Sequence, residues 1–264
     1  MHPPLPLSGV VVAFNEADRI ERCVTSLRAV CAEVIVVDSG STDGTRERAA
    51  ALGARVVEQP WLGFARQKNL AIALAAQPWV LLLDADEWLE REALDALRAL
   101  FASGRLDAAD VVVLPRRTRF LGSVMDHGSF AAEPVERLFR AHCRHEELAV
   151  HERLDTRGQR VIASTVRMEH DTARSADEYW AKLQRYAALW ADERAARATA
   201  TGRRVRVPPG RASAAALAYL AKNLVLRLGV LDGPGAWRFH ALHARYAALK
   251  YRLLRALSRP TPRS

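Results

Sequence analysis

Cysteine is scarce in this chain, and its cysteines do not have the spacing of a metal site. Cys23, Cys31 and Cys143 are three in number, and none lies in a CxxC pair. An odd count without paired spacing argues against a disulfide framework and against a zinc site built from thiolates. We therefore expect three thiols that are buried or incidental.

Long apolar segments are also missing. The longest Ala/Leu-rich stretch, residues 212–221, ends at Lys222, well short of the roughly 20 apolar residues that a membrane-spanning helix needs. The first residues, MHPPLPLSG, contain neither the basic nor the apolar segment of a cleaved signal peptide. The sequence thus predicts a cytoplasmic protein that does not cross a membrane.

Several motifs that bind phosphates, activate nucleophiles or hold zinc are absent. No GxGxxG follows the first apolar run and no GxxxxGK[ST] occurs, so the dinucleotide and P-loop classes lack their phosphate-binding loop. Ser41 directly follows Gly40, which excludes a GxSxG nucleophile elbow. HEELAVHE has Ala149 where HExxH needs its second histidine. The histidines between residues 127 and 170 match no recurrent zinc spacing, so we expect them in the core or in a binding pocket.

Acidic residues are nearly absent from the last quarter of the chain. Residues 203–264 contain thirteen Lys and Arg and a single acid, Asp232, which gives this region a net charge of +12. The rest of the chain carries −3, within a total of +9. Such asymmetry indicates attraction to an anionic surface, which could be phospholipid headgroups, a phosphorylated glycolipid or nucleic acid.

Short apolar runs, rich in β-branched residues and leucine, recur through the first 115 residues. They are GVVVAF (9–14), EVIVVD (33–38), RVVE (55–58), WVLLLD (79–84) and DVVVLP (110–115). Strands that are buried on both faces have this pattern, and helical patterns lie between them. The chain is therefore predicted to be an α/β protein with a mostly parallel sheet flanked by helices.

Polar, acid-bearing segments directly follow three of these predicted strands. They are Asn15-Glu16, DSGS (38–41) and DADE (84–87). Ligands of open α/β sheets bind beyond the carboxyl ends of the strands, so we expect the three segments to meet at one site.

Two of these segments contain aspartates that could bind a metal or a nucleoside. Asp84 and Asp86 can direct two carboxylates at a Mg²⁺ or Mn²⁺ ion that also bridges a diphosphate. The alternative is that Asp86 or Glu87 only supports the start of the next helix. Asp38, which precedes a Gly-containing turn, can accept a hydrogen bond from a base or a ribose, although an ordinary strand-to-helix turn has the same sequence.

Four segments, taken in order, resemble glycosyltransferase family 2: VVVAFNEADRIERCVTSL, VIVVDSGSTDGT, GFARQKNLAI and WVLLLDADEWL. RRTRFLG, RLFR, VHERL and GVLDGPGAW also resemble the branch that adds a β-linked glucose to heptose in the lipopolysaccharide inner core. The resemblance implies a GT-A fold, a UDP-sugar donor, a divalent metal (Mg²⁺ or Mn²⁺) and inversion at the anomeric carbon by one direct displacement.

The resemblance also implies roles for individual residues on the donor side. Asp86 would contact the metal, and Lys68 would neutralise charge on the diphosphate, the alternative being a solvated surface lysine. The residues that would bind the nucleotide are Ala13, Asn15, Glu16, Asp38, Ser41, Lys68 and Asp84.

Inversion requires a carboxylate that removes the proton of the acceptor hydroxyl. The similar branch has an Asp four residues before its RLF segment, where this chain has Glu133. Glu133 is therefore the predicted base, with Asp126 and Glu136 as the other candidates.

On the acceptor side, the resemblance points to Arg137, His151 and Glu152. An ion pair or a structural hydrogen bond would explain these residues equally well. The basic C-terminal helices suit an enzyme that reaches a phosphorylated glycolipid from the inner-membrane surface, as a peripheral protein. A solvated Arg-rich surface is the alternative.

The predicted domains follow from this. Residues 1–170 form the GT-A catalytic domain, with a nucleotide-sugar half (1–115) and an acceptor half (116–170). Residues 171–264 form a basic helical extension, with helices near 176–200, 212–228 and 234–257.

The predicted function is metal-dependent, inverting transfer of a hexose, expected to be glucose, from a UDP-sugar to an inner-core heptose of lipopolysaccharide. A polyprenyl-phosphate glycosyltransferase would share the fold and the donor chemistry. A nucleic-acid-binding protein that uses the basic tail is the alternative from another class, but it leaves the converging acids unexplained. We therefore expect no nucleic-acid partner.

Overall fold

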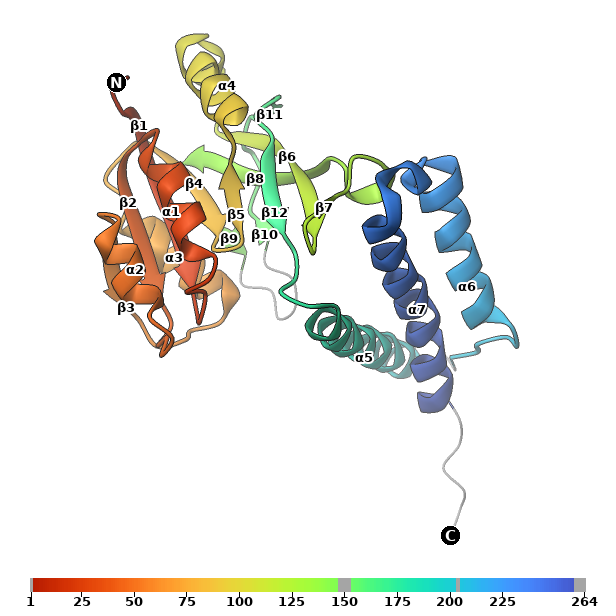
Figure 1. Ribbon diagram of the computed structural model, residues 1–264. Helices are drawn as coiled ribbons and strands as arrows, with labels where there is room; N and C mark the ends of the chain where they lie inside the picture. Colours follow the sequence, from red (N-terminus) through yellow and green to blue (C-terminus); the bar gives the residue numbers. More distant parts are fainter. Residues whose placement is uncertain (1, 147–152, 203–204, 259–264) are drawn as a thin grey trace. The chain divides into compact units, whose positions relative to one another are not determined.

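The computed structural model describes residues 2–146, 153–202 and 205–258, and the chain divides into two compact units (Figure 1). The α/β unit contains Met1–Arg117 and Ala132–His170, and the helical unit contains Thr118–Ala131 and Asp171–Ser264. Residues 118–131, which the sequence placed in the acceptor half, thus belong with the C-terminal helices. The reason is that Phe120, Met125 and Phe130 join the apolar core of those helices.

The sheet runs in the order β3-β2-β1-β4-β8-β6-β12-β5, with β7 and β11 paired to β6. Its strands are β1 (Leu5–Ala13), β2 (Cys31–Asp38), β3 (Arg55–Glu58), β4 (Trp79–Asp84), β5 (Glu87–Leu89), β6 (Val111–Phe120), β7 (Ser123–Val124), β8 (Glu133–Arg140), β11 (Val161–Ala163) and β12 (Met168–Asp171). A separate short pair is formed by β9 (His145–Glu146) and β10 (Arg153–Leu154).

The sheet is mixed rather than mostly parallel. Strands β3, β2, β1 and β4 are parallel, as the nucleotide half of the prediction required. Strand β8 is antiparallel to both β4 and β6. No long crossover helix separates β6 from β8 in the chain, and without such a crossover neighbouring strands pair antiparallel.

Helices cover both faces of the parallel part of the sheet. They are α1 (Ile20–Arg28), α2 (Thr45–Ala51), α3 (Phe64–Ala73) and α4 (Arg91–Ala102), followed by the short 3-10 helix η1 (Arg105–Ala108). Successive residues of β1 point to opposite faces, so Val11 packs with α1 and α4 while Val10 packs with α3. The predicted α/β class with doubly covered strands is confirmed, and the three cysteines are free and buried.

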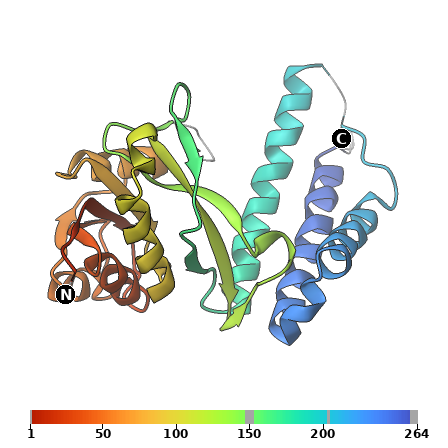
Figure 2. The same cartoon turned by 90° about the horizontal axis from the view of Figure 1, so that it is seen from above.

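The described residues of the helical unit form three long helical segments, with a bend between the last two, and Figure 2 shows these helices from above. They are α5 (Ala176–Ala200), α6 (Arg211–Leu220) continued by a π-helical turn η3 (Ala221–Leu226), and η4 (Gly229–Asp232) leading into α7 (Gly233–Leu257). A short 3-10 turn, η2 (Gly128–Phe130), belongs to the same unit. Ser175 caps α5 by accepting a hydrogen bond from the Glu178 amide at 3.1 Å.

Aromatic rings form the core of the helical unit. Tyr179 of α5 stacks on Phe239 of α7 with ring centroids 5.6 Å apart, and Phe120 lies 5.4 Å from Phe239. This explains the aromatic spacing that predicted a helix over 176–200. The predicted C-terminal helical extension is therefore confirmed.

Among the described residues, no single helix is long and apolar enough to span a membrane. One pair, Arg211–Leu226 with Gly229–Leu257, meets that criterion of length and composition only when both parts are counted across their 78° bend.

Candidate active site

The loops that follow β1 and β2 are joined by hydrogen bonds. The backbone N–H of Asn15 donates to Ser41 Oγ at 2.8 Å, and the side-chain Oδ1 of Asn15 accepts from the backbone N–H of Thr42 at 2.9 Å. Asn15 itself adopts a left-handed backbone conformation (φ 55°), which asparagine tolerates better than most residues. Ala13 is buried at the end of β1, and the Glu16 amide donates to Thr45 Oγ1 at 2.8 Å. The structure therefore brings two of the three predicted segments together.

Asp38 organises the turn after β2. Its fully buried carboxylate accepts from the Gly40 amide at 3.0 Å and the Ser41 amide at 2.8 Å, and the Ser41 hydroxyl also donates to it. These bonds are those of a structural strand-to-helix turn, the alternative that the sequence left open. A contact of Asp38 with a base or a ribose stays a prediction.

Asp84, at the end of β4, accepts ion pairs from two cations. Lys68 Nζ lies 3.2 Å from Oδ1 and Arg137 Nη2 lies 2.5 Å from Oδ2. The Lys68 side chain is only 7% exposed, whereas that of Asp84 is 37% exposed. Lys68 is thus a buried cation and not a solvated surface lysine.

The electrostatic surroundings set the charge state of this carboxylate. Burial alone would raise the pKa of Asp84, but the charges of Arg137 and Lys68 outweigh it and hold that pKa well below its usual value. Burial would likewise lower the pKa of Arg137, but Asp84 and Glu87 raise it above its ordinary value. Asp84 is therefore ionised throughout the neutral range.

Glu87 connects Asp84 to the predicted base. Its fully buried carboxylate accepts from Arg137 Nη2 at 2.8 Å and from Arg116 Nη1 at 3.0 Å. Arg116 Nη2 in turn lies 2.6 Å from Glu133 Oε2. Five side chains of alternating charge thus form a continuous row, which we call the charge row: Asp84, Arg137, Glu87, Arg116 and Glu133.

Asp86 lies beside a histidine that the sequence did not single out as a ligand. Its Oδ2 is 3.5 Å from His170 Nε2 on β12 and 3.5 Å from Arg19 Nη1. His170 Nδ1 and Arg19 Nη2 are buried and have no hydrogen-bond partner. No spacing signal could have paired His170 with Asp86, because 84 positions of chain separate two residues that the antiparallel pairing of β12 with β5 brings together.

This donor set fits a divalent cation that a diphosphate completes. In the part of the chain that the structure describes, no group of three His, Cys, Asp or Glu side chains could hold a metal by itself. Mg²⁺ and similar ions in phosphate-binding sites commonly use one or two protein ligands and take the remaining oxygens from the phosphates and water. Asp86 and His170 suit that arrangement, and the unsatisfied Arg19 nitrogen suits an anionic oxygen nearby.

The base candidates and acceptor residues are distributed unevenly. Glu133 is on β8 with its side chain 40% exposed, and Glu136 is on the same strand. Asp126 belongs to the helical unit. Arg137, predicted to bind the acceptor, is instead buried between Asp84 and Glu87, because its guanidinium neutralises both carboxylates.

Two further acceptor candidates, His151 and Glu152, lie outside the described residues. His145, one of the histidines expected in the core or in a pocket, is buried. Burial, together with the charges of Lys68 and Arg137, lowers its pKa to about 3, so its ring is neutral at physiological pH. Its backbone exchanges two hydrogen bonds with the Asn69 side chain, at 2.7 and 2.9 Å.

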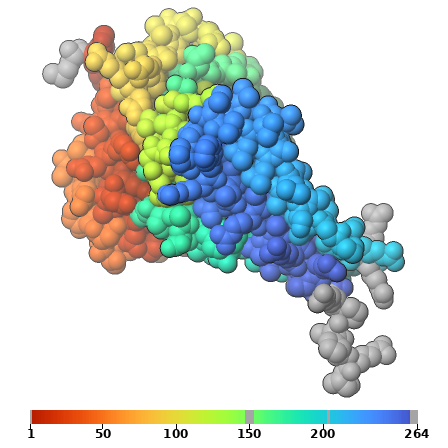
Figure 3. Space-filling model, turned by 45° about the vertical axis from the view of Figure 1, so that its right-hand side comes forward, coloured from red at the N-terminus to blue at the C-terminus, as the bar shows by residue number. Residues whose placement is uncertain are grey.

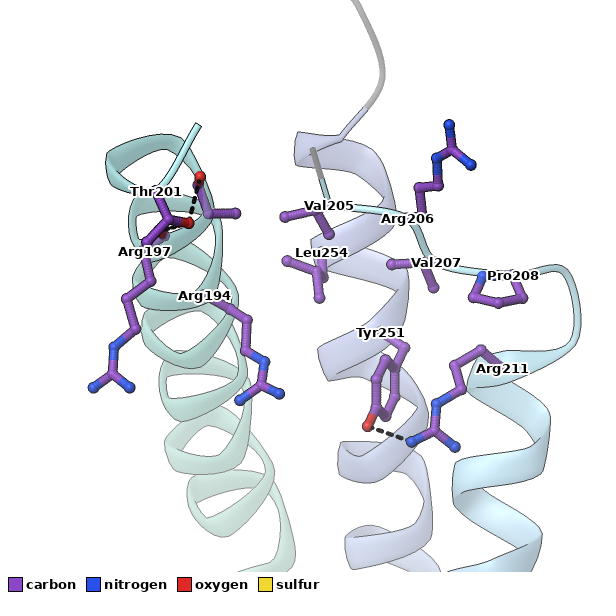
Figure 4. A pocket seen from close by; sticks show the side chains of 11 residues that line it. Arg194, Arg197, Thr201, Val205, Arg206, Val207, Pro208, Arg211, Tyr251 and Leu254 are labelled. Carbon is purple, nitrogen blue, oxygen red and sulfur yellow. Dashed lines mark hydrogen bonds between the residues drawn. The ribbon is translucent and has the colours of Figure 1, made fainter. Parts of the chain in front are cut away.

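A separate pocket of about 530 Å³ lies in the helical unit (Figure 4). Arginines from α5, from the following segment and from α6 line it, together with Tyr251 and Leu254 of α7: Arg194, Arg197, Arg206 and Arg211. Arg211 donates to Tyr251 Oη at 2.8 Å, and Arg197 pairs with Glu193 at 2.5 Å. No acid lines this pocket among the described residues, so it concentrates part of the positive charge that the sequence assigned to the C-terminal region.

Comparison with known proteins gives the family. A model of Glycosyl transferase family 2 matches residues 8–164. The chain belongs to glycosyltransferase family 2. The resemblance read from the four sequence segments is confirmed, and the α/β unit with its C-terminal helices agrees with the architecture that the resemblance implied.

Individual relatives of this glycosyltransferase cover different shares of the chain. The lipopolysaccharide core biosynthesis glycosyltransferase LpsC of Rhizobium meliloti is 33% identical over 203 residues, which cover 73% of each chain. An uncharacterized glycosyltransferase of Rickettsia bellii is 46% identical over 101 residues. The matched part spans only 34% of the length of that Rickettsia protein and 38% of this chain. Among solved structures, glucosyl-3-phosphoglycerate synthase of Mycobacterium tuberculosis, in complex with Mn²⁺, UDP and glucosyl-3-phosphoglycerate, is 28% identical over 44% of each chain, with a TM-score of 0.35.

Removing the central charge of the row should destabilise the α/β unit. Glu87→Gln keeps the shape of the side chain but leaves Arg116 and Arg137 buried without their shared carboxylate, so we expect a loss of about 3 kcal/mol in the free energy of unfolding. Glu193→Gln, which breaks an exposed helix pair, should cost about 0.5 kcal/mol or less. Urea unfolding measures both, and equal losses would contradict a special role for Glu87.

The ion pairs of Asp84 should make stability depend on pH in a defined direction. The folded pKa of Asp84 is depressed, so below its unfolded value of about 4 the unfolded chain binds more protons, and the stabilisation fades as the pH falls. Asp84→Asn should therefore lower the free energy of unfolding at neutral pH. The difference in this free energy between the variant and the wild type should shrink as the pH falls below about 4. Thermal unfolding at a series of pH values tests this, and a difference that does not change with pH would refute it.

Proposed function

We propose that this enzyme transfers a hexose, expected to be glucose, from a UDP-sugar to a heptose of the lipopolysaccharide core, with inversion at the anomeric carbon and with a divalent metal. The observation that carries the donor half of the proposal is the arrangement at the end of β4. Asp84 and Asp86 are held there beside the buried cation Lys68 and the histidine His170. The acceptor half is supported by the similarity to LpsC, a lipopolysaccharide core biosynthesis glycosyltransferase.

On the donor side, the chain supplies both cations and metal ligands. Asp86 and His170 would hold Mg²⁺ or Mn²⁺, which when bound supplies Lewis-acid stabilisation of the leaving diphosphate. Arg19 has an unsatisfied buried nitrogen that would donate to a phosphate oxygen. Lys68, held beside Asp84, would add positive charge where negative charge develops. The joined loops after β1 and β2 would receive the nucleoside.

On the acceptor side, Glu133 would act as the base. The acceptor hydroxyl oxygen would form a bond to the anomeric carbon while the bond from that carbon to the phosphate oxygen breaks, and the hydroxyl proton would pass to the Glu133 carboxylate. Arg116 holds one oxygen of that carboxylate at 2.6 Å, which would orient it. Through Glu87 and Arg137, the same charge row also holds Asp84. The proposed donor site and the proposed base would therefore be positioned by one set of ion pairs.

The proposed location is the cytoplasmic surface of the inner membrane, where the protein would be bound peripherally. The excess of +12 over residues 203–264 supports this location, because anionic lipid surfaces attract such clusters. A glycolipid acceptor would be reached there.

The metal assignment can be tested by binding as well as by turnover. UDP with Mn²⁺ should stabilise the wild type by about 2.7 kcal/mol at a ligand concentration 100 times Kd. Asp86→Ala and His170→Ala should abolish the metal-dependent part of this stabilisation and lower kcat/KM by about 100-fold or more. His142→Ala, which changes an exposed histidine of the same unit, should leave both unchanged. Undiminished Mn²⁺-dependent UDP binding in the His170 variant would exclude that ligand.

The base assignment rests on a comparison within β8. UDP release would be followed with a panel of UDP-sugars and a heptose-containing core glycolipid as acceptor. Glu133→Gln should lower kcat by about 10²- to 10⁴-fold with little effect on KM for the donor. Glu136→Gln makes the same chemical change three residues along the strand and should retain most activity. The reverse order of the two variants would move the base to Glu136.

The same assay separates the acceptor classes. Transfer to polyprenyl phosphate but not to the core glycolipid would keep the donor site and overturn the lipopolysaccharide assignment.

A further inference from the structure

The bend of the helical unit exposes an unusual concentration of apolar side chains. We call it the elbow and define it as residues 221–238, which contain η3, η4 and the first turn of α7. Leu226 is 79% exposed and Leu231 is 65% exposed. The remaining exposed apolar members are Val225, Leu228, Val230 and Trp237. An apolar cluster of this kind on a protein surface marks a binding face far more often than single exposed leucines do.

The backbone of the elbow has unusual local conformations. Leu228 has a φ of 58°, a left-handed conformation that is unfavourable for a residue with a branched side chain. It lies two residues after the π-helical turn Ala221–Leu226, a rare form that is frequent at functional sites. At the next position, a Cβ would lie 2.6 Å from the Asn223 carbonyl oxygen, so only Gly229 fits. Strain of this kind persists where the surrounding structure enforces it, and it clusters at functional sites.

Polar side chains fasten the elbow from its inner side. Asn223 is buried and its Oδ1 accepts from the Ser129 amide at 3.0 Å and from Ser129 Oγ at 2.6 Å. Asp232 is buried against His127, whose Nδ1 lies 2.5 Å from Oδ1. The Trp237 indole donates to the Val230 carbonyl at 3.0 Å. Asn223 and Asp232 are therefore held on the inner side, whereas the large apolar side chains of the elbow are exposed.

The charges around the elbow identify the kind of partner. The single acid of residues 203–264 is Asp232, and it is buried in the pair with His127. The exposed charged residues of the elbow are Lys222, Arg227 and Arg238, all cations. A second copy of this chain would bring like charges together at the contact, which opposes association. Exposed apolar side chains on a segment whose exposed charges are all cations suit a surface that is apolar inside and anionic at its boundary.

We propose that the elbow is the surface with which this protein docks on a bilayer of anionic phospholipids. Leu226, Leu231 and Trp237 enter the boundary between headgroups and acyl chains, and the three cations contact lipid phosphates. The helices α6 and α7 that carry the elbow form the blue face of the surface in Figure 3. A rigid elbow enters the bilayer without ordering a flexible segment, which is a free-energy cost that binding would otherwise include.

This inference deepens the proposed function, which rests on an acceptor held in a membrane, but its test needs neither donor nor acceptor. The full chain would be floated with vesicles of phosphatidylcholine alone or mixed with phosphatidylglycerol. The wild type should bind the mixed vesicles, and the double variant Leu226→Asn/Leu231→Asn should lower the partition coefficient tenfold or more. The matched control, Val161→Asn/Leu189→Asn, makes the same changes at two exposed apolar positions outside the elbow and should bind like the wild type.

Two further measurements separate the apolar and ionic parts of the contact. Lys222→Gln/Arg238→Gln should remove the preference for anionic vesicles and its dependence on salt, because exposed charges are screened. Brominated acyl chains should quench part of the tryptophan fluorescence in the wild type, and Trp237→Phe should remove that part.

The proposal fails if the wild type does not float with the anionic vesicles, or if the Leu226/Leu231 variant floats as well as the control. It also fails if sedimentation shows that the Leu226/Leu231 variant only breaks a dimer. UDP binding measured on the same variants distinguishes this failure from failure of the proposed function, because elbow variants should bind UDP normally.

Discussion

The ion pairs of the buried Glu87 carboxylate hold the candidate active site together. Two guanidinium groups, from Arg116 and Arg137, are taken out of water beside it, and each also holds a second, partly exposed carboxylate. A buried charge is tolerated only when it is paired and hydrogen-bonded, so none of these groups can move without leaving another uncompensated. That constraint places Asp84 and Glu133 relative to each other, although they come from different strands.

The charge row also explains why a family 2 glycosyltransferase can carry so many charges at one sheet edge. Asp84 is kept ionised by Lys68 and Arg137, while Asp86 faces His170 and Arg19 at its own position two residues later. The two carboxylates of the DAD segment therefore have separate surroundings. One is neutralised by the protein, and the other, on our proposal, is completed by a metal and a diphosphate.

The helical unit, unlike the candidate site, has an apolar core and exposes apolar side chains at one place. Phe120, Tyr179 and Phe239 are buried and form its aromatic core. At the elbow, however, Asn223 and Asp232 form buried polar contacts while Leu226 and Leu231 are exposed. The structure gives a physical reason for two residues of the segment GVLDGPGAW, which resembles a known branch of the family. Its glycine at 229 permits the close turn and its aspartate holds His127.

Much of the fold could be read from local patterns, because strands buried on both faces and amphipathic helices leave periodic signals in a single stretch of chain. The predicted strands at 9–14, 33–38, 55–58, 79–84 and 110–115 correspond to β1, β2, β3, β4 and β6. The antiparallel entry of β8 between β4 and β6 was not predicted. Strand neighbours that are distant in the chain have no local signature.

The candidate site divides along the same line. The candidate segments could be located from the sequence, since Asn15, Asp38, Asp84 and Asp86 lie at or just after the ends of strands that were expected to meet at one edge. The folded structure was needed to find that Arg137 pairs with Asp84, that Lys68 is buried, and that His170 lies beside Asp86. Those contacts depend on the pairing of strands that are distant in the chain and on which charges are buried together. Neither leaves a signal in a local stretch of sequence.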